Sequence, residues 1–180
     1  MKLLAIDPGN IESAYVLMDG YKPLKFGKVQ NAELLRIIRE DASWQADAVA
    51  IERVASYGMP VGREVFETCE WVGRYSLAAD TEGLPVDYVY RADVKLNFCG
   101  SSRAKDGNVR QALIDRFARH DTKNGKGTKK DPDWFYGFAK DIWAAYAVGV
   151  TWMDARKEYG EPGAEVTITE KQKMDLLAHL

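Results

Sequence analysis

Long apolar runs, cysteine and histidine are scarce in this chain of 180 residues, and each scarcity excludes a class of protein. No run approaches the roughly 18 consecutive apolar residues of a membrane span, so we expect no membrane segment. Asp7 interrupts the stretch MKLLAIDPG, which a secretory signal would need to keep apolar. Cys69 and Cys99 have neither a metal-type spacing nor a disulfide framework around them, so we expect reduced thiols. These absences predict a cytoplasmic protein, or one of the host cytoplasm if its source is viral.

The length and composition favour a single compact domain. Hydrophobic residues make up 46% of the chain, enough for a sizeable core, and 180 residues are few for two ordinary domains. We expect residues 1–157 to form this domain. Residues 158–180 are expected to be a tail rather than a separate domain, with a peripheral strand at residues 166–169 and a short helix.

Positive charge is concentrated in one segment, although the net charge is only −2. Residues 91–130 contain eleven Lys or Arg and four Asp, which gives +7, and the rest of the chain has 14 basic and 23 acidic residues, which gives −9. A phosphate-binding surface needs local rather than total positive charge, so this segment is a candidate nucleic-acid surface. A solvated charged helix and loop is the alternative interpretation.

Apolar runs separated by turn residues predict a mixed α/β fold. Three runs divided by Pro-Gly-Asn and Asp-Gly predict consecutive antiparallel strands, and two later runs predict further strands. The five expected strands are residues 3–7, 14–18, 25–29, 48–52 and 86–90. Helical spacing predicts helices over residues 32–39, 64–79, 92–98, 104–119 and 135–157. This order of elements is typical of a central sheet with helices on its faces.

Local signals predict how some of these elements begin and end. Asn31 is a suitable N-cap for the first helix, and Ser101 and Ser102 are suitable caps for the helix over residues 104–119. Residues 120–130 are polar and basic and contain two glycines, so we expect a mobile loop there.

Three acidic residues from distant parts of the chain stand at the ends of expected elements. Asp7 and Glu52 each close an apolar strand, and Asp141 precedes the apolar face of the last helix. Singly, each acid has an ordinary explanation as a turn, strand-end or helix N-terminal residue. If the first and fourth strands are neighbours, the three converge at one rim of the sheet. Such a cluster requires cations, and its oxygen ligands favour Mg²⁺ or Mn²⁺, so we expect two such ions per site.

Four segments of the sequence resemble one known family, in the order in which that family has them. LAIDPGNIESAYVLM is similar to the first hairpin of RuvC-type Holliday-junction resolvases, and AIERV resembles their second acidic strand. VKLNFCGSSRAKDGNVRQAL falls in register with the segment that follows their third helix, and DIWAAYAVGV resembles their last helix. The resemblance covers residues 1–153 and leaves the tail unexplained.

The resemblance implies a fold, an activity and a set of metal ligands. The fold is ribonuclease H-like: a mixed five-stranded sheet with helices on both faces. The activity is that of a DNA-recombination endonuclease, a homodimer that binds a four-way junction and nicks two strands symmetrically. Asp7, Glu52 and Asp141 match three of the family's four Mg²⁺ ligands, and Lys95 matches a lysine close to the scissile phosphate.

Further residues are expected to contact DNA or the second subunit. We expect the basic segment to bind DNA through Lys95, Arg103, Lys105 and Arg110. Tyr57 lies just after Glu52, where the family places a junction-contacting residue. The helix over residues 64–79, with Trp71 and Tyr75, is the expected centre of the dimer because aromatic residues anchor interfaces well. Packing of these aromatics on their own sheet is the alternative.

The sequence departs from the family pattern at two positions. The fourth ligand is expected three residues after Asp141, on the same helix face, and Ala144 stands there. Either Asp131 or Asp133 completes the site, or activity is reduced, or the alanine is a deliberate replacement of an aspartate. The second active-site lysine would fall at Asp106, with Lys105 one step away.

Three other functions compete with a junction-resolving nuclease. A ribonuclease H-like nuclease acting on structured RNA would keep the same acids. A non-catalytic or inactivated junction-binding protein would explain Ala144. A sugar-kinase or actin-like phosphotransferase also begins with an acidic turn, but it needs two domains and a second glycine-rich phosphate loop, which 180 residues do not supply.

Overall fold

A five-stranded mixed sheet forms the centre of the computed structural model, which describes residues 1–40, 44–56, 58 and 60–159. The strand order is β3-β2-β1-β4-β5, in which β1 pairs antiparallel with β2 and β2 with β3, whereas β1, β4 and β5 run parallel. The strands are β1 (Lys2–Asp7), β2 (Glu12–Asp19), β3 (Lys22–Gln30), β4 (Ala48–Arg53) and β5 (Val86–Tyr90). All five predicted strands are confirmed, with the first and fourth as neighbours.

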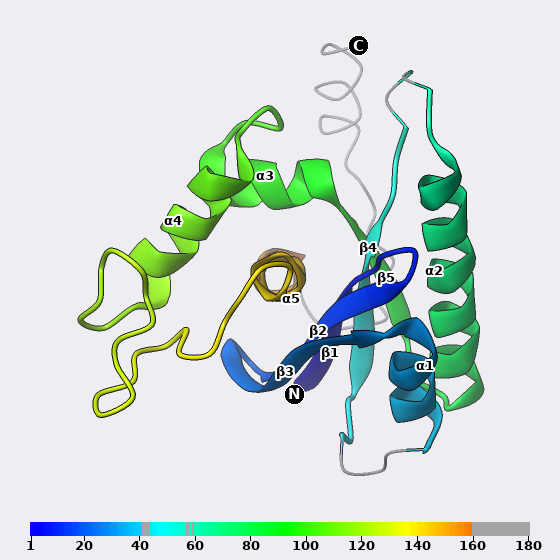
Figure 1. The fold of residues 1–180 in the computed structure, drawn as a ribbon, viewed down its shortest axis with the longest axis horizontal. Coiled ribbons are helices and arrows are strands. Elements are labelled where there is room, and N and C mark those ends of the chain that lie inside the picture. The colour runs from blue at the N-terminus through cyan, green and yellow to red at the C-terminus, as the bar shows by residue number, and fades with distance from the viewer. Residues whose placement is uncertain (41–43, 57, 59, 160–180) are drawn as a thin grey trace.

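Helices cover both faces of this sheet (Figure 1). On one face lie α1 (Asn31–Glu40) and α2 (Arg63–Thr81), and on the other lie α3 (Arg91–Cys99), α4 (Asp106–Phe117) and α5 (Ile142–Tyr159). The predicted α/β, ribonuclease H-like class is therefore confirmed. None of the helices within the described ranges is long and apolar enough to span a membrane. The expected strand at residues 166–169 lies outside the described residues.

The side chains of β1 alternate between the two faces of the sheet, so the core consists of two clusters. Leu4 and Ile6 pack toward α1 and α2, whereas Leu3 and Ala5 pack toward α5, because successive side chains of a strand point to opposite faces. A Cβ atom at Gly149 of α5 would collide with the sulfur of Met18. Helix α5 therefore lies directly on the sheet, which places its first turn beside the end of β1.

Some predicted helix boundaries and caps are wrong. Helix α5 begins at Ile142 rather than near residue 135, because Gly137 and Lys140 adopt φ angles of 88° and 43° that a right-handed helix excludes. Helix α4 begins at Asp106, and Ser101 accepts the amide of Arg103 instead of capping it. The Asn31 side chain bonds Ser13 Oγ and the Gly9 carbonyl, so it fastens the turn after β1 rather than capping α1.

The expected mobile loop at residues 120–130 is held by two carboxylates, those of Asp121 and Asp133. Asp133, whose side chain is fully buried, accepts the amides of Arg119, His120, Asp121 and Trp134. Burial alone would raise the pKa of Asp133, but these four amides hold it well below its usual range. Asp121 in turn accepts amides of residues 124, 126 and 127. The polar composition of the segment predicts mobility, but Asp121 within it and Asp133 just beyond it order the loop.

Candidate active site

Asp7 and Glu52 emerge side by side at one rim of the sheet. β1 and β4 are parallel and in register, with Ile6 opposite Ile51, so the next residue of each strand is an acid. The Glu52 side chain is only 15% exposed. The convergence of these two acids, predicted from their strand-end positions, follows directly from the pairing of the strands.

A buried hydrogen-bond network holds the turn that follows Asp7. Ser13 Oγ accepts the Gly9 amide at 3.2 Å and donates to Asn31 Oδ1 at 2.7 Å. The hydroxyl of Tyr75, from α2, lies 3.1 Å from the same Ser13 oxygen. A Cβ atom at Gly9 would collide with the Glu12 carbonyl oxygen, so the turn accepts only glycine there. The position of Asp7 is thereby fixed by β2, α1 and α2 together.

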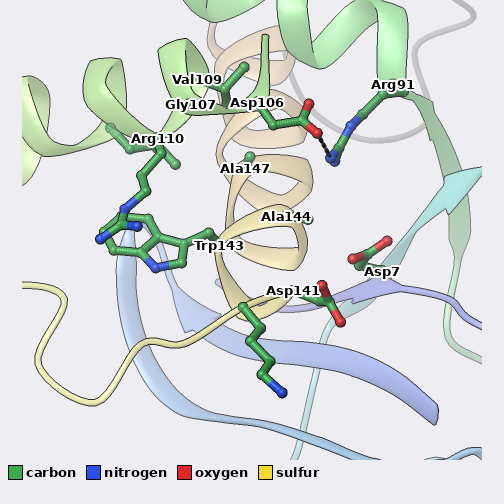
Figure 2. Close-up of a pocket in the computed structure, with 12 residues that line it drawn as sticks. Asp7, Arg91, Asp106, Gly107, Val109, Arg110, Asp141, Trp143, Ala144 and Ala147 are labelled. Atoms are coloured by element: carbon green, nitrogen blue, oxygen red, sulfur yellow. Dashed lines mark ion pairs between the residues drawn. The ribbon is translucent and has the colours of Figure 1, made fainter.

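Asp141 lines the same cavity as Asp7. It directly precedes α5 and its carbonyl accepts the Ala145 amide at 3.0 Å. Asp7, Asp141 and Ala144 all line a cavity of about 420 Å³ between β1, α4 and α5. Figure 2 shows the two carboxylates facing one another below Ala144. Ala144 is half-exposed whereas Ile142, Trp143 and Ala145 are buried, so the position expected to carry a fourth ligand does open onto this cavity.

Neither alternative fourth ligand lies in this cavity. Asp133 is buried among the loop amides described above, and Asp131 lies 3.4 Å from His120 on the same loop. The cavity lining contains neither residue. Of the three explanations for Ala144, the one in which Asp131 or Asp133 completes the site is therefore wrong.

Two basic residues that the sequence did not single out pair with the acids. Lys28 Nζ lies 2.7 Å from Asp141, and Arg91 Nη1 lies 3.0 Å from Glu52. Strand register contained the signal for Lys28, because Asp7 pairs with Ala14 and Ala14 with Lys28 across β1, β2 and β3. Arg91 follows β5, the neighbour of β4, at the same rim.

Burial and mutual repulsion shift the acids toward their neutral forms. Burial, and after it the charge of Glu52, raises the pKa of Asp7 to about 7. Burial also raises the pKa of Glu52, although Arg91 opposes that shift. The pKa of Lys28 rises because its ammonium donates to Asp141. The buried, mutually repelling carboxylates therefore destabilise the fold when they are ionised, and a bound cation would reduce this destabilisation.

An Asp7→Asn variant is expected to be more stable than the original chain without metal at about pH 8, by about 1 to 3 kcal/mol. Because the pKa of Asp7 is about 7 in the fold and 3.8 otherwise, the unfolded chain loses its proton first, and stability falls as pH rises between these values. At about pH 3, below the pKa of Asp7 in the unfolded chain, both states are mostly protonated and the advantage should nearly vanish. Urea denaturation in EDTA at both pH values measures this. An equal advantage at both would contradict the burial of an ionised Asp7, and exposed Asp80→Asn on α2 is the control.

The donor set fits a hard divalent cation by its chemistry. Asp7, Glu52 and Asp141 offer only oxygen ligands, which Mg²⁺ and Mn²⁺ prefer and zinc does not. Across the described part of the chain, no three His, Cys, Asp or Glu side chains lie close enough to share an ion as they stand. Glu52 and Asp141 instead hold Arg91 and Lys28. Binding of a metal would therefore require these ion pairs to rearrange.

Four of the predicted DNA-contacting residues, Lys95, Arg103, Lys105 and Arg110, lie on or just before α3 and α4, and one of them lines the cavity. Arg110 lines the cavity and its guanidinium lies 4.6 Å from the Trp143 ring. Arg103 and Lys105 are exposed just before α4. Lys95 Nζ lies 3.7 Å from Asp106 Oδ1. Asp106 stands at the position expected for a second active-site lysine, so its carboxylate partly neutralises the charge of Lys95. Tyr57 lies outside the described residues.

Solved structures of RuvC resemble this chain over most of its length. A RuvC structure from Thermus thermophilus aligns with 19% sequence identity and a TM-score of 0.61 over 88% of this chain and 97% of that one. RuvC from T. thermophilus in complex with Holliday junction substrate aligns with 19% identity and a TM-score of 0.61, covering 90% and 99% of the two chains. No protein-family model matches the sequence, and no curated protein matches it significantly. At this identity the likeness establishes a RuvC-like fold.

Proposed function

We propose that this chain is a magnesium-dependent endonuclease of the RuvC type that cuts four-way or otherwise branched DNA. The observation that carries this proposal is the meeting of Asp7 and Asp141 in one cavity, at the rim where Glu52 lies near the end of β4, on a RuvC-like fold. One structural neighbour is RuvC in complex with a Holliday junction, which supports branched DNA as the substrate class.

In phosphodiester hydrolysis, one group of residues would hold the metal ion and another would bind the DNA phosphates. Mg²⁺ or Mn²⁺ held by Asp7, Asp141 and Glu52 would supply water activation and stabilisation of the leaving oxygen. Asp7, fixed by its buried turn network, would keep the ligand geometry constant. Lys95 and Arg110 would bind phosphates of the substrate on the α3–α4 side of the cavity.

Binding of junction DNA is expected to depend steeply on salt through the exposed residues near α4. Replacing Arg103 and Lys105 together with alanine should weaken binding at low salt. It should also lower the slope of log K against log salt by about 0.9 for each phosphate that the variant no longer neutralises. Fluorescence anisotropy over a salt series measures both quantities. Arg36→Ala with Arg39→Ala, on α1 across the sheet, is the matched control. An unchanged slope would remove this surface from the proposal.

A homodimer is proposed, because symmetric cleavage of a four-way junction needs two active sites. The expected interface centre requires correction: Tyr75 is 0% exposed and bonds Ser13, and half-buried Trp71 packs against it with ring centroids 5.9 Å apart. The exposed face of α2 instead carries Phe66 and Leu77, which are 61% and 62% exposed. These are the apolar side chains that a second subunit would cover.

A Phe66→Asp, Leu77→Asp double variant is expected to shift the protein from dimer to monomer at micromolar concentration, because each buried carboxylate would lack a partner. Light scattering measures the mass, and Leu24→Asp on β3, 41% exposed in the original, is the control. A monomeric original chain, both free and with junction DNA, would contradict the dimer.

A panel of substrates tests the proposed function. A four-way junction, a duplex of the same sequence and a folded RNA are compared for binding and for cleavage in Mg²⁺ and in Mn²⁺. Preferential nicking of the junction supports the proposal, and preferential cleavage of the RNA supports a structured-RNA nuclease in its place.

A junction-binding protein without cleavage is the second candidate, and Ala144 is the observation that favours it. Tight junction binding without nicking in either ion would support this candidate. Restoration of nicking by Ala144→Asp would then show that the scaffold is a nuclease that lacks one ligand.

A further inference from the structure

Arg91 places a positive charge between Glu52 and the cavity. Its Nη1 atom lies 3.0 Å from Glu52 Oε2, and its Nη2 atom lies 3.2 Å from Asp106 Oδ2. The guanidinium lines the cavity together with Asp7 and Asp141, whereas Glu52 does not line it (Figure 2). A carboxylate expected to hold a metal ion is therefore already occupied by a cation of the chain.

The charges that line the cavity disfavour a second divalent ion. Three carboxylates line it, those of Asp7, Asp106 and Asp141, together with three cations, Arg91, Arg110 and Lys140. These charges balance before any metal binds. One divalent ion would therefore leave an excess of +2 and two would leave +4, so the second ion is the more costly to add.

We propose that Arg91 is a built-in cation of the active site, which holds Glu52 and limits the site to a single divalent ion. The inference rests on the proposed metal-dependent function and replaces the two ions expected from the sequence. Ala144 agrees with it, since a site with one fewer anionic ligand attracts fewer cations. Arg91 acts here as a positioning residue for Glu52.

The number of bound ions tests this directly, without any measurement of cleavage. Mn²⁺ titration of the full chain, followed by electron paramagnetic resonance, should give one tightly bound ion. Arg91→Gln should bind a second ion, or bind the first tighter by on the order of tenfold, because the repulsion of an adjacent charge is removed. Arg91→Lys restores the charge and should return to a single ion. Mn²⁺ should also raise the Tm of Arg91→Gln more than that of the original chain.

Arg53→Gln is the matched control, because it removes the same charge one residue beyond Glu52. The Arg53 guanidinium lies 4.9 Å from the Tyr88 ring and is exposed. Two tightly bound ions or none in the original chain would overturn the proposal even if Arg91→Gln failed to fold. Equal binding by Arg91→Gln and the original chain, or an equal gain with Arg53→Gln, would also overturn it. Absence of nicking alongside the expected ion counts would refute the nuclease and leave the role of Arg91 standing.

Discussion

An Ala144→Asp variant is expected to nick a four-way junction in Mg²⁺ on the order of 100-fold faster than the original chain, a difference of about 2.7 kcal/mol in transition-state free energy. Ala144 lies on the first turn of α5 and opens onto the cavity that Asp7 and Asp141 share. A carboxylate there would project toward the same ion as Asp141, one helical turn away. The original chain is expected to nick slowly or not at all.

Ala144→Asn separates the charge of the new side chain from its size. Asparagine has nearly the same volume as aspartate but is a neutral and weaker ligand, so it should give little of the gain. Single-turnover nicking under excess protein measures all three proteins. The missing-ligand idea fails if Ala144→Asp gains nothing over the original chain. It fails equally if the original chain already nicks at about 1 per minute or faster, which is slow on the scale of typical enzymes.

Loss of Asp7 is expected to have the second large effect. In the Ala144→Asp background, Asp7→Asn should lower Mg²⁺-dependent nicking by on the order of 1000-fold or more, because a charged ligand at the centre of the site becomes neutral. Asp7 lies close enough to both Glu52 and Asp141 to interact with each electrostatically. An ion shared with either acid would therefore lose a ligand when Asp7 is replaced. Junction binding should be retained or become tighter, since one negative charge near the DNA is removed.

The control for this loss is Asp80→Asn in the same background, an exposed aspartate on α2 across the sheet. It should nick at the rate of its parent. Nicking by Asp7→Asn within about tenfold of that rate would show that Asp7 is not a metal ligand, and weakened junction binding would point to a misfolded protein instead.

The fold and the main acids could be predicted because their signals are local. Apolar runs ending at Asp7 and Glu52 mark strand ends, and parallel neighbours bring such ends to one rim. The place of Asp141 was likewise predictable, although the helix after it begins later than expected because the backbone turns at Gly137 and Lys140.

The rest of the site depends on contacts between elements that periodicity does not encode. Arg91 and Lys28 reach the acids only through the strand pairing, and neither stands in a motif. Tyr75 was expected at an interface because aromatic residues occur in both places, and only the packing of α2 on the sheet shows that it is core. The order of the loop at residues 120–130 depends on Asp133, which lies outside that segment.

Strand-resolved nicking of a four-way junction tests the central claim most directly. Each strand of the junction is labelled in turn and incubated with the Ala144→Asp protein in Mg²⁺ or in EDTA. We predict Mg²⁺-dependent nicks in two opposite strands at symmetric positions, and none in EDTA or in the linear duplex. Nicking that persists in EDTA, or a junction that is bound but left intact in both Mg²⁺ and Mn²⁺, would contradict the proposed function.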